Sequence, residues 1–175
     1  MFVFRLCTLG VHALIENVVS ISTLMICTFL STMVVGIFML QVWLTDRRHA
    51  AAGYWCLSMW VGSLCTLLYA LRPMGLPMLT VGFSNMLAAL GYALMWAGFR
   101  VFDRRPAYLP VVLAGPVLWC LAYLLVPQVT DNVNNRIVVS SVIITAYSFW
   151  MGIDILRGRS HEPLPTRTMS AIFFL

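Results

Sequence analysis

Two polar side chains interrupt long apolar stretches of this sequence and are the best candidates for binding chemistry. Asn85 lies roughly 10 Å along a helix that starts near Met78. A buried amide in lipid requires hydrogen-bonding partners, so Asn85 is predicted either to bond a neighbouring helix or to contact a ligand. Asp154 lies near the end of a later apolar stretch, three residues before Arg157. That spacing predicts an ion pair on one helix face.

The remaining titratable residues form no catalytic or metal-binding pattern. A haem-binding membrane bundle needs facing histidines within the bilayer, and the three histidines lie outside the apolar stretches: His12, His49 and His161. The five cysteines contain no CxxC pair and are expected to act as small apolar residues: Cys7, Cys27, Cys56, Cys65 and Cys120. Six acidic residues provide little material for acid–base chemistry. We therefore expect no catalytic residue, no metal and no cofactor.

The composition predicts helices that span a membrane. Hydrophobic residues make up 61% of the 175 residues and charged residues 10%, with a mean hydropathy of +0.91; soluble domains average about 25% charged residues. A span needs about 20 apolar residues. The expected spans are about 20–44, 53–71, 78–99, 109–126 and 136–156, with 169–175 as an incomplete sixth. The predicted fold is an all-α polytopic membrane helix bundle over 18–175, with five complete transmembrane helices, the start of a sixth, and 1–17 as an outer extension.

Arginines alternate between the breaks that separate the apolar stretches. Eight fall in the first, third and fifth breaks: Arg47, Arg48, Arg100, Arg104, Arg105, Arg157, Arg159 and Arg167. Arg72 and Arg136 stand alone in the second and fourth breaks. Because cytoplasmic loops are enriched in Lys and Arg, the rich breaks are predicted to be cytoplasmic and the N-terminus outside. The arginines set topology on the lipid bilayer, so no nucleic-acid partner is expected.

Small and hydroxyl residues recur at helical spacing in three stretches. These stripes are Ser58, Gly62 and Thr66; Asn85, Ala89, Ala93 and Ala97; and Ser141, Thr145, Ser148 and Gly152. Such residues let helix backbones approach closely, so helix packing is the expected role, with a ligand cavity as the alternative. A ligand is expected to enter from outside, between the turn at 72–77 and the polar loop at 128–135, above Asn85.

Two runs resemble the N-terminal membrane region of bacterial GGDEF diguanylate cyclases. They are WLTDRRHAAAGYWCLSMWVGSLCTLLYALR (43–72) and SNMLAALGYALMWAGFRVFDRRP (84–106). The residues that match the pattern are Asn85, Gly91, Gly98, Arg100 and Pro106. The resemblance covers about 18–175 and implies a sensory input region in the bacterial inner membrane, acting in cyclic di-GMP signalling. A homodimer, through the helices or a missing cytoplasmic domain, is expected.

The sequence departs from that family because it contains no GGDEF motif. Its catalytic chemistry therefore cannot be placed on any residue here, and the chain itself is not expected to be an enzyme. We interpret the chain as truncated before its output domain. The alternatives are a fragment of a transporter or permease, which would hold polar groups near the bilayer midplane, and a small integral membrane protein.

Overall fold

The structure is a computed structural model that describes residues 21–47, 49–72, 75 and 78–157. The described residues form helices and no strand. The helices, in chain order, are α2 (Ile21–Thr45), α3 (Ala50–Ala70), the π-helix η2 (Met78–Phe83), α4 (Ser84–Phe102), α5 (Leu109–Leu125), α6 (Pro127–Asp131) and α7 (Val133–Arg157). The predicted all-α class is confirmed.

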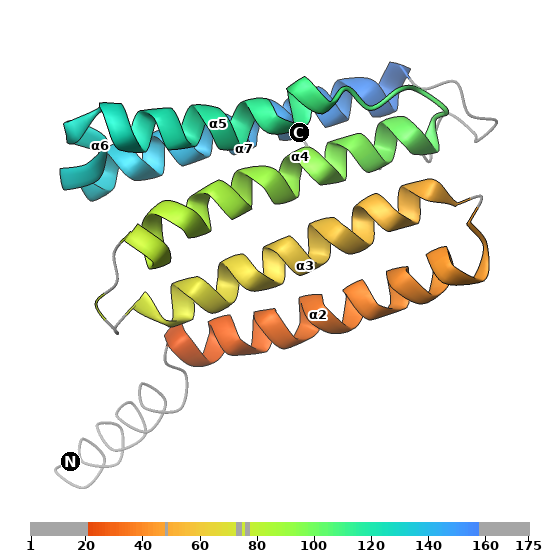
Figure 1. Ribbon diagram of the computed structural model, residues 1–175, viewed down its shortest axis with the longest axis horizontal. Coiled ribbons are helices and arrows are strands. Elements are labelled where there is room, and N and C mark those ends of the chain that lie inside the picture. The colour runs from red at the N-terminus through yellow and green to blue at the C-terminus, as the bar shows by residue number, and fades with distance from the viewer. Residues whose placement is uncertain (1–20, 48, 73–74, 76–77, 158–175) are drawn as a thin grey trace, which may run out of the picture.

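The long helices run up and down beside one another, with α4 at the centre (Figure 1). The order across the bundle is α2, α3, α4, and then α5 and α7, which both contact α4. Helix α4 is the most buried of the long helices. The core consists of Ala93, Leu94, Trp96, Ala97, Val112, Tyr147, Met151 and Ile155.

Within the described residues, four helices are long and apolar enough to cross a membrane: Thr23–Thr45, Ala50–Ala70, Thr80–Phe102 and Val133–Arg157. Leu109–Leu125 is apolar but shorter, and its 17 residues rise about 26 Å against the roughly 30 Å hydrocarbon core. It ends because Val126 precedes a proline and is extended, at φ −112° and ψ 96°. Pro127 then opens α6, where a missing N–H costs nothing, and α7 begins at Val133, within the polar segment predicted as a loop.

The described arginines divide between the two ends of the bundle. One end, which we call the arginine-rich end, holds the α2–α3 turn, the α4–α5 loop and the last turn of α7 (Figure 1). Its arginines are Arg47, Arg100, Arg104, Arg105 and Arg157. Arg72 and Arg136 lie at the opposite end, where α3 ends and α7 begins. Arg48, Arg159 and Arg167 lie outside the described residues.

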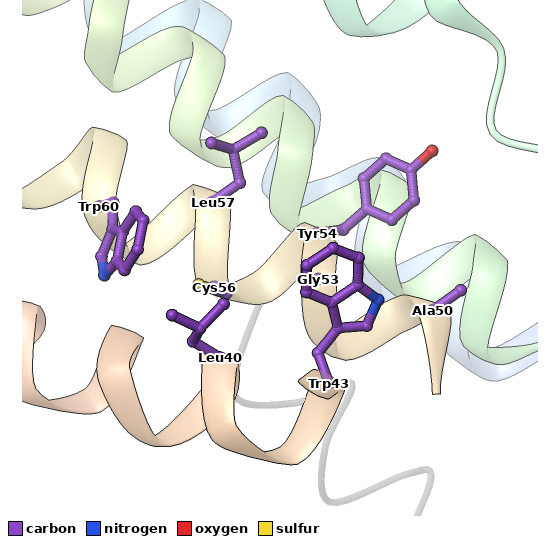
Figure 2. Close-up of a pocket in the computed structure, with 8 residues that line it drawn as sticks. All are labelled: Leu40, Trp43, Ala50, Gly53, Tyr54, Cys56, Leu57 and Trp60. Atoms are coloured by element: carbon purple, nitrogen blue, oxygen red, sulfur yellow. The ribbon is translucent and has the colours of Figure 1, made fainter. Parts of the chain in front are cut away.

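Aromatic rings lie against glycines at several of the helix contacts. The pairs are Trp60 on Gly36 and Trp43 on Gly53 between α2 and α3, Trp55 on Gly98 between α3 and α4, Tyr123 on Gly82 between α5 and η2, and Tyr147 on Gly115 between α7 and α5. A methyl group at Gly36, Gly98 or Gly115 would collide with the ring, and at Gly53 or Gly82 it would press tightly against it, so each glycine leaves room for a ring. Figure 2 shows the Trp43 ring over Gly53.

Candidate functional site

Asn85 is the centre of a polar cluster that joins three helices at the Arg72/Arg136 end. The Tyr69 hydroxyl of α3 donates to Asn85 Oδ1 at 2.6 Å, and Asn85 Nδ2 donates to the Val81 carbonyl at 2.8 Å. The Ser140 hydroxyl of α7 lies 3.0 Å from Asn85 Oδ1 and 2.9 Å from the Arg136 carbonyl. Asn85 thus makes hydrogen bonds between helices, as one of its two predicted roles requires; contact with a ligand stays a prediction.

The π-helix η2 directly precedes Asn85, the second residue of α4, and its carbonyls accept side-chain hydrogen bonds. A π-helical turn shifts the register of the backbone ladder and frees a carbonyl. The Gly82 carbonyl accepts from Trp119 Nε1 at 2.7 Å, and the Ser84 hydroxyl donates to the Thr80 carbonyl at 2.6 Å. The bond from Trp119 holds η2, and with it the start of α4, against α5, whereas the Ser84–Thr80 bond lies within the η2–α4 segment itself.

A polar pocket of about 220 Å³ opens beside Asn85. Its polar lining comes from Tyr69, Arg72, Asn85, Arg136, Ser140 and Ser141, and its apolar lining from Val81, Val133, Ile137 and Ile144. The lining holds two arginines and no acidic residue. Arg136 Nε is buried and has no hydrogen-bond partner. This pocket lies where the sequence predicts a ligand entrance.

Asp154 is the centre of a second cluster, at the arginine-rich end. Its carboxylate accepts from Trp96 Nε1 at 2.9 Å, from Arg100 Nη1 at 3.3 Å and from Arg105 Nη1 at 3.2 Å. The three charged side chains are only 11%, 15% and 24% exposed, in the order Asp154, Arg100, Arg105. The predicted Asp154–Arg157 pair is wrong: Asp154 faces the bundle, whereas Arg157 is exposed.

The same arginines fold the α4–α5 loop onto the end of α7. Arg100 Nε donates to the Pro106 carbonyl at 3.0 Å, and Arg105 Nη2 donates to the Arg157 carbonyl at 2.6 Å. The loop turns sharply at Arg104, whose φ is 58°. The Arg100 guanidinium lies 5.1 Å from the Trp96 ring centre and 5.4 Å from that of Tyr108, a favourable cation–π arrangement. We call this cluster, made by Trp96, Arg100, Arg105, Asp154 and the Arg157 carbonyl, the Asp154 cluster.

Two further hollows are apolar and suit lipid contact. The larger, about 420 Å³, lies between α2 and α3 and is lined by Leu40, Trp43, Ala50, Gly53, Tyr54, Cys56, Leu57 and Trp60 (Figure 2). The other, about 250 Å³, lies beside η2 and α5 and is lined mainly by aromatic and aliphatic side chains. Neither is lined by a charged residue, so neither offers a charge that could bind an ionic ligand.

The predicted stripes of small residues divide between contacts and open faces. The Ser58 hydroxyl donates to the Gly91 carbonyl at 2.8 Å across α3 and α4, and Ala89, Ala93 and Ala97 are buried. A methyl group at Gly62 would meet nothing within 4 Å, and Thr66 bonds the Ser63 carbonyl of its own helix.

On α7 the predicted stripe is rotated away from the bundle at its start. Ser141 and Thr145 are exposed, Ser148 is half-buried and Gly152 is buried. The face that contacts the bundle carries Tyr147, Met151, Asp154 and Ile155 instead. Ser140 and Tyr69 were missed because single hydroxyl groups near span ends carry no distinguishing pattern. Ser63, which lies 2.7 Å from the Thr32 hydroxyl of α2, was missed for the same reason.

The described residues contain no group of side chains that could hold a metal ion, and their four cysteines are free thiols. No protein-family model, curated protein or solved structure matches this chain.

Proposed function

We propose that this chain is the membrane-embedded input region of a bacterial signalling protein, a diguanylate cyclase whose output domain follows it. One observation carries the proposal: the polar pocket and the Asp154 cluster lie at opposite ends of the same two helices. Asn85 and Arg100 both belong to α4, and Ser140 and Asp154 both belong to α7. The spacing along α4 between Asn85 and Arg100 is about 22 Å by helical rise.

This arrangement provides a route from a ligand to the cytoplasm. A ligand in the pocket would compete for the Ser140–Asn85 contact and so alter how α7 lies on α4. The shift would reach the Asp154 cluster, which is the other polar contact between the two helices. Signalling of this kind requires a ligand that binds one of two helix arrangements more tightly than the other. The resemblance of 43–72 and 84–106 to the cyclase input regions supports the same assignment.

The proposed topology is five complete spans in the inner membrane, with the N-terminus outside and the arginine-rich end in the cytoplasm. The α4–α5 loop and α6 lie at opposite ends of the bundle (Figure 1), so α5, although short, runs from one end of the bundle to the other and is proposed as the fourth of the five spans. We expect alkaline phosphatase fused after residue 132 to be active and after residue 104 to be inactive, because this enzyme needs the oxidising space outside the cytoplasm for its disulfides. The reverse pattern would overturn the topology.

The gene provides a direct test of the signalling assignment. Sequencing beyond the Leu175 codon should reveal further membrane helix and then a soluble domain with a Gly-Gly-Asp-Glu-Phe motif. A stop codon followed by unrelated sequence would contradict the cyclase assignment. A downstream set of further spans without a soluble domain would favour the transporter alternative instead.

A further inference from the structure

We infer that the pocket beside Asn85 binds a small anion through an oxyanion group held by Arg136 and Arg72. The inference rests on the proposed function in treating this pocket as the input site, and it adds the chemical class of the ligand. Both arginines line the pocket, and no carboxylate lines it with them. The ion pairs among the described residues involve neither arginine.

The buried Arg136 Nε is the observation that points to a ligand. This N–H group is removed from solvent without a hydrogen-bond partner, and a buried donor left unpaired costs stability, more so when it is charged. The other residues that line the pocket offer hydroxyl groups and an amide but no negative charge to satisfy it. A carboxylate or phosphate oxygen would satisfy it with a charge-assisted hydrogen bond, and the planar guanidinium suits such groups.

The size and walls of the pocket limit the rest of the ligand. Its volume of about 220 Å³ is below the roughly 300–1,000 Å³ of pockets for drug-sized ligands. Ser140 and Ser141 line the pocket from α7, and Val81, Ile137 and Ile144 provide apolar surface. A short carboxylate with an apolar tail matches this combination. An anionic lipid headgroup offers the same oxyanion chemistry from the membrane.

Butyrate binding to the purified chain tests the site. In neutral detergent, calorimetry should show that butyrate binds at least tenfold more tightly than butyramide, which has the same shape but no charge. Arg136→Gln should weaken butyrate binding at least tenfold, and Ser140→Ala should weaken it several-fold. Arg47→Gln is the matched control, because it removes an exposed arginine that lies at the other end outside the Asp154 cluster, and it should leave the affinity unchanged.

Retention of phosphatidylglycerol by the protein in nanodiscs, compared with butyrate binding, distinguishes the two sources of the anion. If butyrate binds in neutral detergent, the anion that the pocket takes is a free carboxylate. If the wild type retains phosphatidylglycerol, Arg136→Gln loses it, and butyrate does not bind, the anion in the pocket is a lipid headgroup. The inference is overturned when Arg136→Gln and the wild type show the same affinity for butyrate and the same retention of phosphatidylglycerol.

Hydrogen exchange separates the anion site from the signalling proposal. Ligand binding should change the exchange of the backbone amides at 100–108, which the Asp154 cluster holds. Binding that depends on Arg136 but leaves this exchange unchanged would support the anion site and contradict the proposed signalling route.

Discussion

Asp154→Leu should lower the free energy of unfolding by about 3–5 kcal/mol, the usual cost of removing one partner from a buried ion pair. The substitution leaves Arg100 and Arg105 largely buried without their carboxylate, and it leaves Trp96 Nε1 without its acceptor. The measurement is unfolding of the purified protein in detergent. The same variant should speed hydrogen exchange at 100–108, because the Asp154 cluster folds this loop onto α7.

Two companion variants test whether the buried contacts cause this effect. Asp131→Asn removes a carboxylate that is exposed in α6 and should change the unfolding free energy by less than about 0.5 kcal/mol. Asp154→Asn keeps an oxygen that can accept from Trp96, and should therefore cost less than Asp154→Leu. Equal unfolding of Asp154→Leu and Asp131→Asn would contradict a structural role for the Asp154 cluster.

The sequence predicts the helices well because apolar length and charged breaks are local signals. Four of the predicted spans correspond to helices of membrane-crossing length, and the breaks at Arg72 and Arg100 lie at helix ends. The spacing of Asp154 could not reveal its partners. Arg157 is near in sequence, but Arg100 lies in the last turn of α4 and Arg105 in the α4–α5 loop, and only the packing of α4 against α7 brings them close to Asp154. Contacts between distant segments depend on helix rotation, which hydropathy does not encode.

The residues behind the family resemblance each make a defined contact. Asn85 bonds α3 and α7, and Gly91 accepts from Ser58. Gly98 lies under the Trp55 ring. Arg100 bonds both Asp154 and the Pro106 carbonyl. The few polar and glycine positions that carry the resemblance are thus points of contact between the helices of this bundle.

The sequence alone could not distinguish glycines at tight helix contacts from glycines that face open space. The sequence predicts that Gly62 brings helices together. A methyl group at Gly91 of α4 would come 4.0 Å from the Gly62 N, yet a methyl group at Gly62 itself would meet nothing within 4 Å. Gly115 was not singled out, yet a methyl group there would come 2.5 Å from Tyr147 Cε2 and 2.9 Å from its hydroxyl. Both are glycines within apolar helices, so the distinction arises only from which ring of a neighbouring helix faces them.

Gly115→Ala should therefore destabilise the bundle by about 1–3 kcal/mol, as overpacking of a close-packed core does. The Tyr147 ring cannot withdraw freely, because its hydroxyl donates to the Val111 carbonyl at 2.6 Å and accepts from the Gly115 N–H at 3.0 Å. In a regular helix that carbonyl and that N–H bond each other. Unfolding in detergent is again the measurement. Gly62→Ala, the matched control, should leave stability unchanged or raise it by up to about 1 kcal/mol.

A second substitution tests whether the Tyr147 ring is the reason that Gly115→Ala destabilises the bundle. In a Tyr147→Leu background the clash is absent and the Val111 carbonyl and Gly115 N–H are free to bond each other, so Gly115→Ala should cost much less there than in the wild type. Residues in direct contact commonly show such coupling, of about 0.5–3 kcal/mol. If Gly115→Ala costs the same in both backgrounds, Tyr147 is not what the glycine accommodates, and the α5–α7 contact would have to be held by another part of the interface.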